Sequence, residues 1–224
     1  SLEVKRLSRL VQSMLSLSRI DNGELKLNRQ EFEMVSVIIN VLAGFEPRIR
    51  EKNLDIRGLE DFRKLKVDAD PDLMHQVIYN LIENAVKFTN ENGYIKFGVT
   101  QTKFEISISI ENSGPGIPPE DIRYIFDRFY RVDKARARET GGTGLGLAIA
   151  QEAVTQHGGH IEVFSQEGAG SKFVIKLAEN SFTVPDRIRM WQKCAEDYRR
   201  LGYYAPKIYA DKTGEFPVVR YKEH

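Results

Sequence analysis

The sequence contains a single cysteine, Cys194, among its 224 residues. A lone cysteine cannot form an internal disulfide or a cysteine-based zinc site, so the composition favours a reducing compartment. Excess charge is absent as well, because 33 Lys and Arg residues are balanced by 32 Asp and Glu residues for a net charge of +1. So small a net charge gives no general attraction to nucleic acid or to an anionic membrane. We therefore expect no nucleic-acid partner, and any recognition must come from local groups of side chains.

Long apolar runs are also missing from the chain. No run approaches the ~20 residues that a membrane-spanning helix needs. The first ten residues, SLEVKRLSRL, lack the apolar core of a signal peptide and have the pattern of the inside of a helix. We expect a cytoplasmic location, either for a separate protein or for the cytoplasmic part of a longer, membrane-bound parent.

Patterns of apolar residues divide the chain into three parts. Residues 1–30 are predicted to form a helix and a linker, because their apolar residues follow the alternating three and four spacing of a helix that packs on other helices. Residues 31–180 are predicted to form the main domain. Residues 181–224 are predicted to be a small C-terminal appendage of unknown role that contains one helical apolar stripe.

Helical and alternating β patterns follow one another within the main domain. This order predicts an α+β fold, a two-layer sandwich in which helices cover a mixed, mostly antiparallel sheet. The first helix is expected to kink or break at Pro47. The predicted helices cover residues 35–52, 71–88 and 147–157, with a short one within 120–129, and the predicted strands cover residues 54–57, 94–100, 104–110, 160–165 and 172–177.

Three polar residues of the second helix form the first candidate site. Asn80 and Asn84 are four residues apart, so their amides project from one helix face, and Lys87 lies one turn further. Such a face can give an oxygen ligand to Mg²⁺ and an ammonium group to a phosphate. A solvated helix face has the same pattern, so these three residues alone do not decide between the two interpretations.

Two glycine-rich segments add to this candidate site. Residues 112–117 follow a β pattern directly, and their glycines would let the backbone approach a flat ligand. Residues 141–147 open a helix, whose first N–H groups and dipole can hold phosphate oxygens. Between these segments, the cations of residues 128–138 predict a mobile lid over a triphosphate. Each segment alone could be an ordinary turn or a solvated loop, and no P-loop sequence is present.

In this order, the segments resemble those of the sensor histidine kinases, within the superfamily that also contains gyrase, heat-shock chaperone and mismatch-repair ATPases. The F box, which those ATPases lack, points to the kinases in particular. The resemblance covers residues 4 to 178. The segments that carry it are the N box NLIENAVKFT, the first glycine box ENSGPGI, the F box IFDRFYR, the second glycine box GGTGLGLAI, the last glycine motif GAGSKF and the stalk-like RLVQSMLSLSRIDNGELKL.

The resemblance implies a catalytic module that binds ATP and transfers its γ-phosphoryl group to a histidine of a dimerisation stalk, for relay to a response regulator. It implies a homodimer in the full-length parent. It assigns Mg²⁺ to Asn84 and Asn80, and it gives Asn84, Lys87 and Arg131 catalytic roles. The residues that it places around the nucleotide are Asn80, Asn84, Lys87, Phe88, Asn112, Gly114, Gly116, Ile117, Phe126, Gly142, Thr143, Gly144, Leu145, Gly146 and Ser171.

The sequence departs from the family pattern at two places. Asn112 stands where the family has an Asp that meets the adenine amino group. In addition, no helix with a phosphoacceptor precedes residue 1, and no histidine lies on the stalk-like helix. The histidines of the chain are His75, His157, His160 and His224. We therefore expect no autophosphorylation of this chain without an added acceptor helix.

Two other functions agree with parts of the sequence. A nucleotide-sensing module would close its lid on ATP and bind another protein, through residues 181–224 or the first helix, without kinase activity. An ATPase of the chaperone or repair type needs a glutamate to activate water, and Glu83 could supply it. The F box and the stalk-like helix argue against the ATPase. Phosphoryl transfer to an added stalk would favour the kinase, and steady hydrolysis without an acceptor would favour the ATPase.

Overall fold

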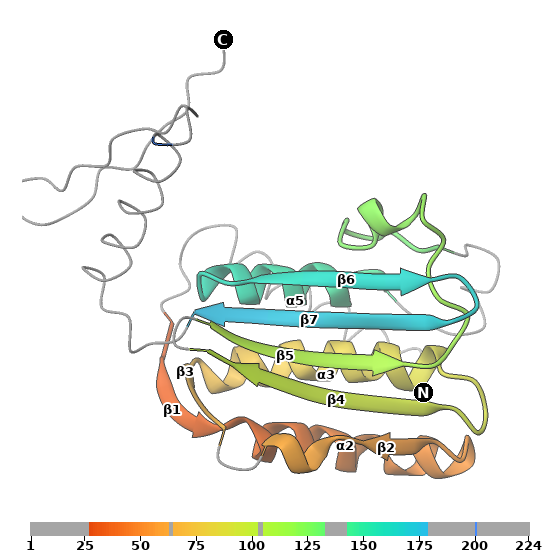
Figure 1. Ribbon diagram of the computed structural model, residues 1–224, viewed down its shortest axis with the longest axis horizontal. Helices are drawn as coiled ribbons and strands as arrows, with labels where there is room; N and C mark the ends of the chain where they lie inside the picture. Colours follow the sequence, from red (N-terminus) through yellow and green to blue (C-terminus); the bar gives the residue numbers. More distant parts are fainter. Residues whose placement is uncertain (1–26, 63–64, 103–104, 133–142, 179–199, 201–224) are drawn as a thin grey trace, which may run out of the picture. The chain divides into compact units, whose positions relative to one another are not determined.

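The computed structural model describes residues 27–62, 65–102, 105–132 and 143–178 together with Arg200. These residues form an α+β sandwich of two layers, which confirms the predicted fold class (Figure 1). One layer is a five-stranded mixed sheet, and the α-helices lie behind it in the view of Figure 1. None of the described helices is long and apolar enough to cross a membrane.

The elements agree closely with the sequence patterns. All three long helices and all five predicted strands begin and end within two residues of their predicted bounds. The helices are α2 (Met34–Glu51), α3 (Pro71–Phe88) and α5 (Gly146–Gln156), with 3₁₀ turns η1 (Leu59–Phe62) and η2 (Ile122–Tyr124). The strands are β1 (Gln30–Glu33), β2 (Asp55–Arg57), β3 (Lys66–Ala69), β4 (Tyr94–Gln101), β5 (Glu105–Asn112), β6 (His160–Gln166) and β7 (Gly170–Ala178).

The main sheet has the strand order β2-β4-β5-β7-β6. Strand β2 runs parallel to β4, and the other neighbouring pairs are antiparallel. In the central strand β5, Ile110 is paired with Phe97 of β4 and with Phe173 of β7. Every second residue of β5 from Ile106 onward is buried, because side chains alternate across a sheet. This buried series ends with Asn112, so a polar amide takes the last core position of the central strand.

Helix α3 packs through one apolar face. Leu73, Val77, Leu81 and Ala85 are buried, as their spacing of four requires. Phe88 continues this spacing, but it is 50% exposed. The backbone of a glycine-rich loop packs against the end of α3 at this point, and glycines have no side chains that could cover the ring.

The N-terminus of α3 is tied to the end of α5. The Asp70 carboxylate accepts hydrogen bonds from the backbone N–H groups of Asp72 and Leu73 at 3.0 and 3.1 Å, so Asp70 caps the helix. The Asp70 N–H in turn donates to His157 Nε2 at 2.9 Å. His157 Nδ1 therefore carries the proton, and it donates to the Ala153 carbonyl at 2.7 Å.

Some parts of the structure differ from the sequence prediction. Strands β1 and β3 form a separate antiparallel pair that was not predicted, because each has only four residues in which alternation can show. The helix expected within residues 120–129 is only the 3₁₀ turn η2. Phe129 has a φ of 65°, a left-handed conformation in which helical geometry cannot continue.

Helix α2 passes through Pro47 without a break, contrary to the expected interruption. The predicted first helix and the predicted appendage concern residues 1–26, 179–199 and 201–224, which lie outside the described residues. The proposed division into three parts therefore stays a prediction.

Candidate functional site

Three segments that are far apart in the sequence meet at the C-terminal half of α3. Gly114, after β5, approaches α3 so closely that a Cβ atom there would lie 2.5 Å from the Phe88 carbonyl oxygen. Gly146, the first residue of α5, lies against the side of α3, and a Cβ atom there would be 3.3 Å from Asn80 Oδ1. The structure therefore brings the predicted polar face of α3 together with both glycine-rich segments.

The turn between β6 and β7 holds the loop that follows β5. The Gly168 N–H donates to the Pro115 carbonyl at 2.7 Å, and the Ile117 N–H donates to Ser165 Oγ at 2.8 Å. Ser165 Oγ also lies 2.8 Å from Ser171 Oγ. Ser171, a predicted site residue, is thus part of a hydroxyl pair that supports this loop.

Asn112 lies at the start of the same loop and is 7% exposed. Its amide nitrogen donates to the Ser113 carbonyl at 3.5 Å, which is the outer limit for a hydrogen bond. A buried amide usually has better partners than this, because unsatisfied polar groups cost free energy. The position and the weak bond are those expected of an amide whose hydrogen bonds a ligand completes.

Asn80 and Asn84 lie one turn apart on α3 and are both half-buried. Asn80 Nδ2 is buried and has no hydrogen-bond partner within the part of the chain that the structure describes. Because buried donors are rarely left unsatisfied, this amide marks a place for a ligand or a water molecule.

The oxygen atoms of this site could bind a metal ion only together with further ligand atoms from a bound phosphate. In residues 27–178, apart from the gaps named above, no three His, Cys, Asp or Glu side chains gather into a group that could hold a metal ion. Amide oxygens of Asn80 and Asn84 are hard donors, which Mg²⁺ accepts, and Mg²⁺ is commonly bound through few protein ligands together with phosphate oxygens and water. These residues therefore agree with Mg²⁺ that is bound together with a phosphate.

Lys87 extends the same helix face, and its Nζ lies 4.9 Å from the centre of the Phe88 ring. Burial lowers the pKa of Lys87, and the nearby Arg131 lowers it further, whereas Glu83 raises it. A partly buried ammonium group close to another cation is stabilised when an anion joins it. The side of α3 that carries Lys87 is therefore a candidate anion site.

A backbone contact joins the segments on either side of residues 133–142. The Phe129 N–H donates to the Gly144 carbonyl at 2.9 Å. Gly144 has a φ of +72°, and a Cβ atom there would lie 2.8 Å from the Phe129 backbone, so this position requires glycine. Gly142, the other predicted glycine of this region, lies outside the described residues.

The remaining predicted site residues pack near this contact or around the glycine loop. Phe126 and Ile117 are partly buried against the main core. Leu145 is fully buried and forms a small cluster with Ile149 at the start of α5. Thr143 Oγ1 accepts a hydrogen bond from the Leu145 N–H at 3.3 Å.

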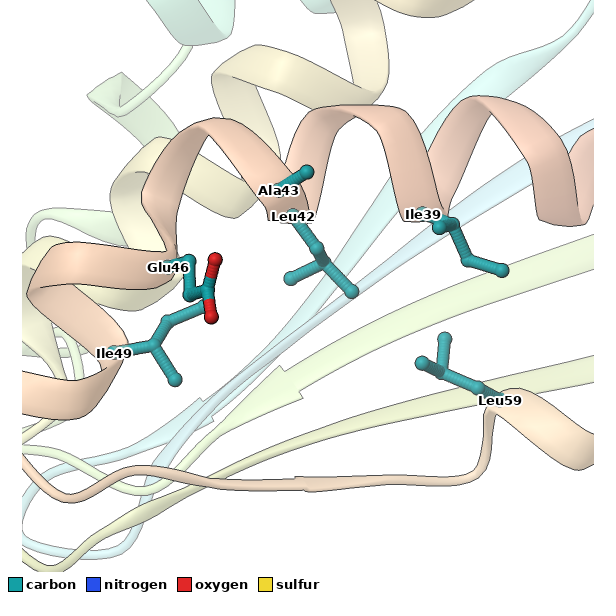
Figure 2. A pocket seen from close by; sticks show the side chains of 6 residues that line it. All are labelled: Ile39, Leu42, Ala43, Glu46, Ile49 and Leu59. Carbon is teal, nitrogen blue, oxygen red and sulfur yellow. The ribbon is translucent and has the colours of Figure 1, made fainter.

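A separate hollow of about 290 Å³ lies between α2 and η1 (Figure 2). It contains none of the predicted site residues. Its lining side chains are Ile39, Leu42, Ala43, Glu46, Ile49 and Leu59. Because these side chains offer no donors to an anion, the meeting point on α3 is the better candidate for a phosphate-bearing ligand.

Comparison with known proteins assigns the chain that carries this site to a family. Residues 69–181 match the family described as "Histidine kinase-, DNA gyrase B-, and HSP90-like ATPase". The chain belongs to this family. It is 42% identical over 178 residues to the sensor histidine kinase WalK of Bacillus subtilis, and the match covers 78% of this chain and 29% of WalK.

Solved structures of histidine kinases have the same fold. The catalytic domain of the histidine kinase ThkA is 33% identical with a TM-score of 0.58, over 68% of this chain and 98% of that one. Full-length ShkA in complex with AMPPNP is 27% identical with a TM-score of 0.66, over 77% of this chain and 36% of ShkA. ThkA in complex with the response regulator TrrA is 28% identical with a TM-score of 0.59, over 78% of this chain and 49% of that one.

The chain therefore carries the catalytic, ATP-binding domain of a sensor histidine kinase, an ATP-dependent transferase domain. It spans less than a third of the length of WalK. Every predicted site residue, from Asn80 to Ser171, lies inside the matched residues 69–181.

Sequence reasoning missed three residues that shape the site of this kinase domain. Ser165 supports the glycine loop, and Phe129 pairs with the glycine segment that opens α5. Lys52, at the end of α2, donates to backbone carbonyls at the end of α3. Phe129 could have been found because it lies in the F box, whereas no motif or spacing marks Ser165 or Lys52.

Proposed function

We propose that this kinase domain binds ATP with Mg²⁺ where α3, β5 and α5 meet, and that it transfers the γ-phosphoryl group to a histidine on a stalk helix outside this chain. The observation that carries the proposal is the helix face with Lys87 and the buried Asn80 amide, which has no partner among the described residues, beside two glycine-rich segments. In the transfer, the bond from the γ-phosphorus to the β–γ bridging oxygen breaks, a bond to an imidazole nitrogen forms, and ADP leaves.

Each residue of the site has a role in this proposal. Lys87 and Arg131 neutralise charge on the phosphate oxygens as the transfer proceeds. The backbone N–H groups from Gly146 onward, at the positive end of α5, receive phosphate oxygens. Asn84 and Asn80 would hold Mg²⁺, which would supply positive charge to neutralise the phosphates. Asn112 meets the adenine base.

The described histidines are poorly suited to be the acceptor. His157 is 5% exposed, and hydrogen bonds occupy both of its ring nitrogens. His75 is exposed but lies nine residues before Asn84, toward the opposite end of α3. His160 is exposed on β6 beside Glu162. An acceptor needs an imidazole that is held in line with the γ-phosphate at near-attack distance, which supports an acceptor on another segment of the parent.

The test is to incubate the chain with labelled ATP and Mg²⁺, with and without a separately made two-helix stalk of its parent. Acid-labile label should appear on the stalk and not on this chain, and Lys87→Met should abolish it. Lys66→Met is the matched control, because Lys66 is an exposed lysine on β3 that bonds to Glu31. Label on the chain itself that disappears when His75 or His160 is replaced would contradict the proposal.

The same experiment separates the other functions. Nucleotide binding without transfer to the stalk would favour the nucleotide-sensing module. Steady hydrolysis that needs no stalk and is lost in Glu83→Gln would favour the ATPase.

We further infer that the parent is a homodimer that passes the phosphoryl group to a response regulator. The solved complex of ThkA with its response regulator TrrA supports the relay to a regulator. The expected location is the cytoplasm, where ATP is supplied and where a lone cysteine stays reduced. Label that never leaves the stalk in the presence of the parent's regulator would contradict the relay.

A further inference from the structure

Lys52, the residue that follows α2, ends in an ammonium group that lies against the C-terminus of α3. Its Nζ donates hydrogen bonds to the backbone carbonyls of Val86, Lys87 and Thr89 at 2.9, 2.9 and 2.8 Å. An ammonium group has three donors, so all of them are used by this one stretch of backbone. The last carbonyls of a helix have no partners within the helix and carry partial negative charge, which a cation stabilises.

The ammonium group takes the place of the usual glycine cap. Many helices end with a left-handed glycine whose neighbouring N–H groups satisfy the last carbonyls. Here the residue after α3, Thr89, is extended, with φ of −70° and ψ of 132°, and its N–H returns to the Ala85 carbonyl. Lys52 donates hydrogen bonds to the carbonyls that have no backbone partner because Thr89 is extended.

Lys52 is half-buried at this position. Burial lowers the pKa of Lys52, and the charge of Arg48 lowers it further, whereas Glu91 and Glu51 raise it. The backbone of Lys52 is itself fixed, because its carbonyl accepts a hydrogen bond from the Asn92 N–H at 2.8 Å. The ammonium group is therefore held from the α2 side as well.

The residues that Lys52 holds are those that meet the nucleotide in the proposed function. The Lys87 carbonyl is one of the three acceptors of Lys52 Nζ. The carbonyl of the next residue, Phe88, faces Gly114, where no side chain would fit. The backbone at the end of α3 is thus clamped between Lys52 and the first glycine loop. The direction in which Lys87 Nζ leaves this backbone depends on both sides of the clamp.

We propose that Lys52 is a positioning residue for the phosphate site: its ammonium group fixes the last turn of α3, so that Lys87 stays directed at the triphosphate. This inference rests on the proposed function. Lys52 lies outside the matched residues 69–181, and it acts on the site from another helix.

The test compares nucleotide affinities of the full chain by calorimetry. Lys52→Met should weaken binding of a non-hydrolysable ATP analogue roughly tenfold, the loss expected when Lys87 is no longer directed at a phosphate and their charge-assisted hydrogen bond is weakened. Adenosine, which has no phosphates, should bind within about twofold of the unchanged protein, because the base does not use Lys87. A purely structural role would lower both affinities together or neither. Lys66→Met is again the control, with both affinities unchanged.

A double-mutant cycle with Lys87→Met decides whether Lys52 acts through Lys87. In the Lys87→Met background, the further loss caused by Lys52→Met should nearly vanish, because the group that Lys52 positions is gone. Lys52→Arg keeps a charged donor and should retain most of the triphosphate affinity. This variant replaces Lys52→Met in the comparison if the methionine variant folds poorly. Equal triphosphate affinity of the unchanged protein and Lys52→Met, or full additivity in the cycle, would overturn the inference. Failure of the unchanged protein to bind ATP would overturn the proposed function instead.

Discussion

Lys87 combines a cost to stability with a benefit to binding. Lys87→Met should lower ATP affinity roughly tenfold to a hundredfold, the range for losing a charge-assisted hydrogen bond. The same change should raise the thermal midpoint, because methionine removes a cation whose pKa is lowered by burial and by Arg131. Calorimetry and thermal denaturation measure the two effects. If the two quantities moved in the same direction, Lys87 would be a structural residue and not part of an anion site.

Asn112 should determine how strictly the base is selected. An amide can accept a hydrogen bond from the adenine amino group or, when flipped, donate to a guanine oxygen, whereas an ionised carboxylate can only accept. Asn112→Asp should therefore raise the preference for ATP over GTP by about tenfold, the effect of one hydrogen bond to a charged group. Competition between the two nucleotides measures this preference. An unchanged ratio would mean that Asn112 does not contact the base.

Single residues of this site differ in how far sequence could identify them. Asn80, Asn84 and Lys87 are recognisable because side chains carry their proposed roles and a helical period sets their spacing. Lys52 is not recognisable, because its acceptors are backbone carbonyls that any residue would supply. Its distance of 34 to 37 residues from those carbonyls follows only from the packing of α2 beside α3.

Among the structural elements, the start of α5 depends on a glycine of left-handed conformation. Gly144→Ala should destabilise the domain by about 1–3 kcal/mol, because a Cβ atom is strained at a φ of +72° and would collide with the Phe129 backbone. ATP affinity should fall as well, since Gly144 leads into the end of α5 that is proposed to bind the phosphates. Urea denaturation and calorimetry measure these losses.

Gly44→Ala is the matched control for that variant. Gly44 lies within α2, and a Cβ atom there would meet nothing within 4 Å. Alanine should therefore stabilise the helix by about 0.5–1 kcal/mol and leave ATP affinity unchanged. Equal effects of the two substitutions would show that the backbone contact with Phe129 does not matter.

The helices and strands were predictable where a local signal is strong. Helix α3 begins at the proline after its aspartate cap and has a clear apolar face, so its predicted bounds were confirmed. The segment within residues 120–129 contains helix-forming residues, but it forms only η2 and turns. Tyr130 Oη donates to the Asp121 carboxylate, and the bond raises the pKa of Tyr130 to about 12. Such a contact closes the segment into turns, and no local pattern reveals it.

Across the described domain, α5 contacts α3 at both of its own ends. At one end, His157 of the α5 terminus bonds to the Asp70 cap of α3. At the other end, Gly146 lies against Asn80, where the phosphates are proposed to bind. The His157 contact brings residues 87 positions apart together and could not be inferred from the sequence, in which His157 has the pattern of an ordinary surface or packing residue.

The hydrogen bond between the Asp70 N–H and His157 should make the stability of the domain depend on pH. Burial lowers the pKa of His157 below its usual 6.5, and Arg29 lowers it further, while the Ala153 carbonyl and the carboxylates of Asp70 and Asp68 raise it. Below about pH 6.5, His157 becomes protonated in the unfolded chain. In the folded domain it stays neutral until the pH falls to its lower, folded-state pKa. The free energy of unfolding should therefore be fully present above pH 6.5 and fall as the pH drops, by up to about 1.4 kcal/mol per pH unit.

Urea denaturation between pH 8 and pH 5 measures this slope. His157→Asn should lower stability at pH 8, because the hydrogen bond from the Asp70 N–H is weakened. It should also remove the part of the pH dependence of the unfolding free energy that comes from protonation of His157. His160→Asn is the control, since His160 is exposed on β6 and its replacement should leave the slope in place. If the asparagine variant at His157 kept the full slope, another group would govern the acid sensitivity, and the two helices would not be coupled through the neutral imidazole.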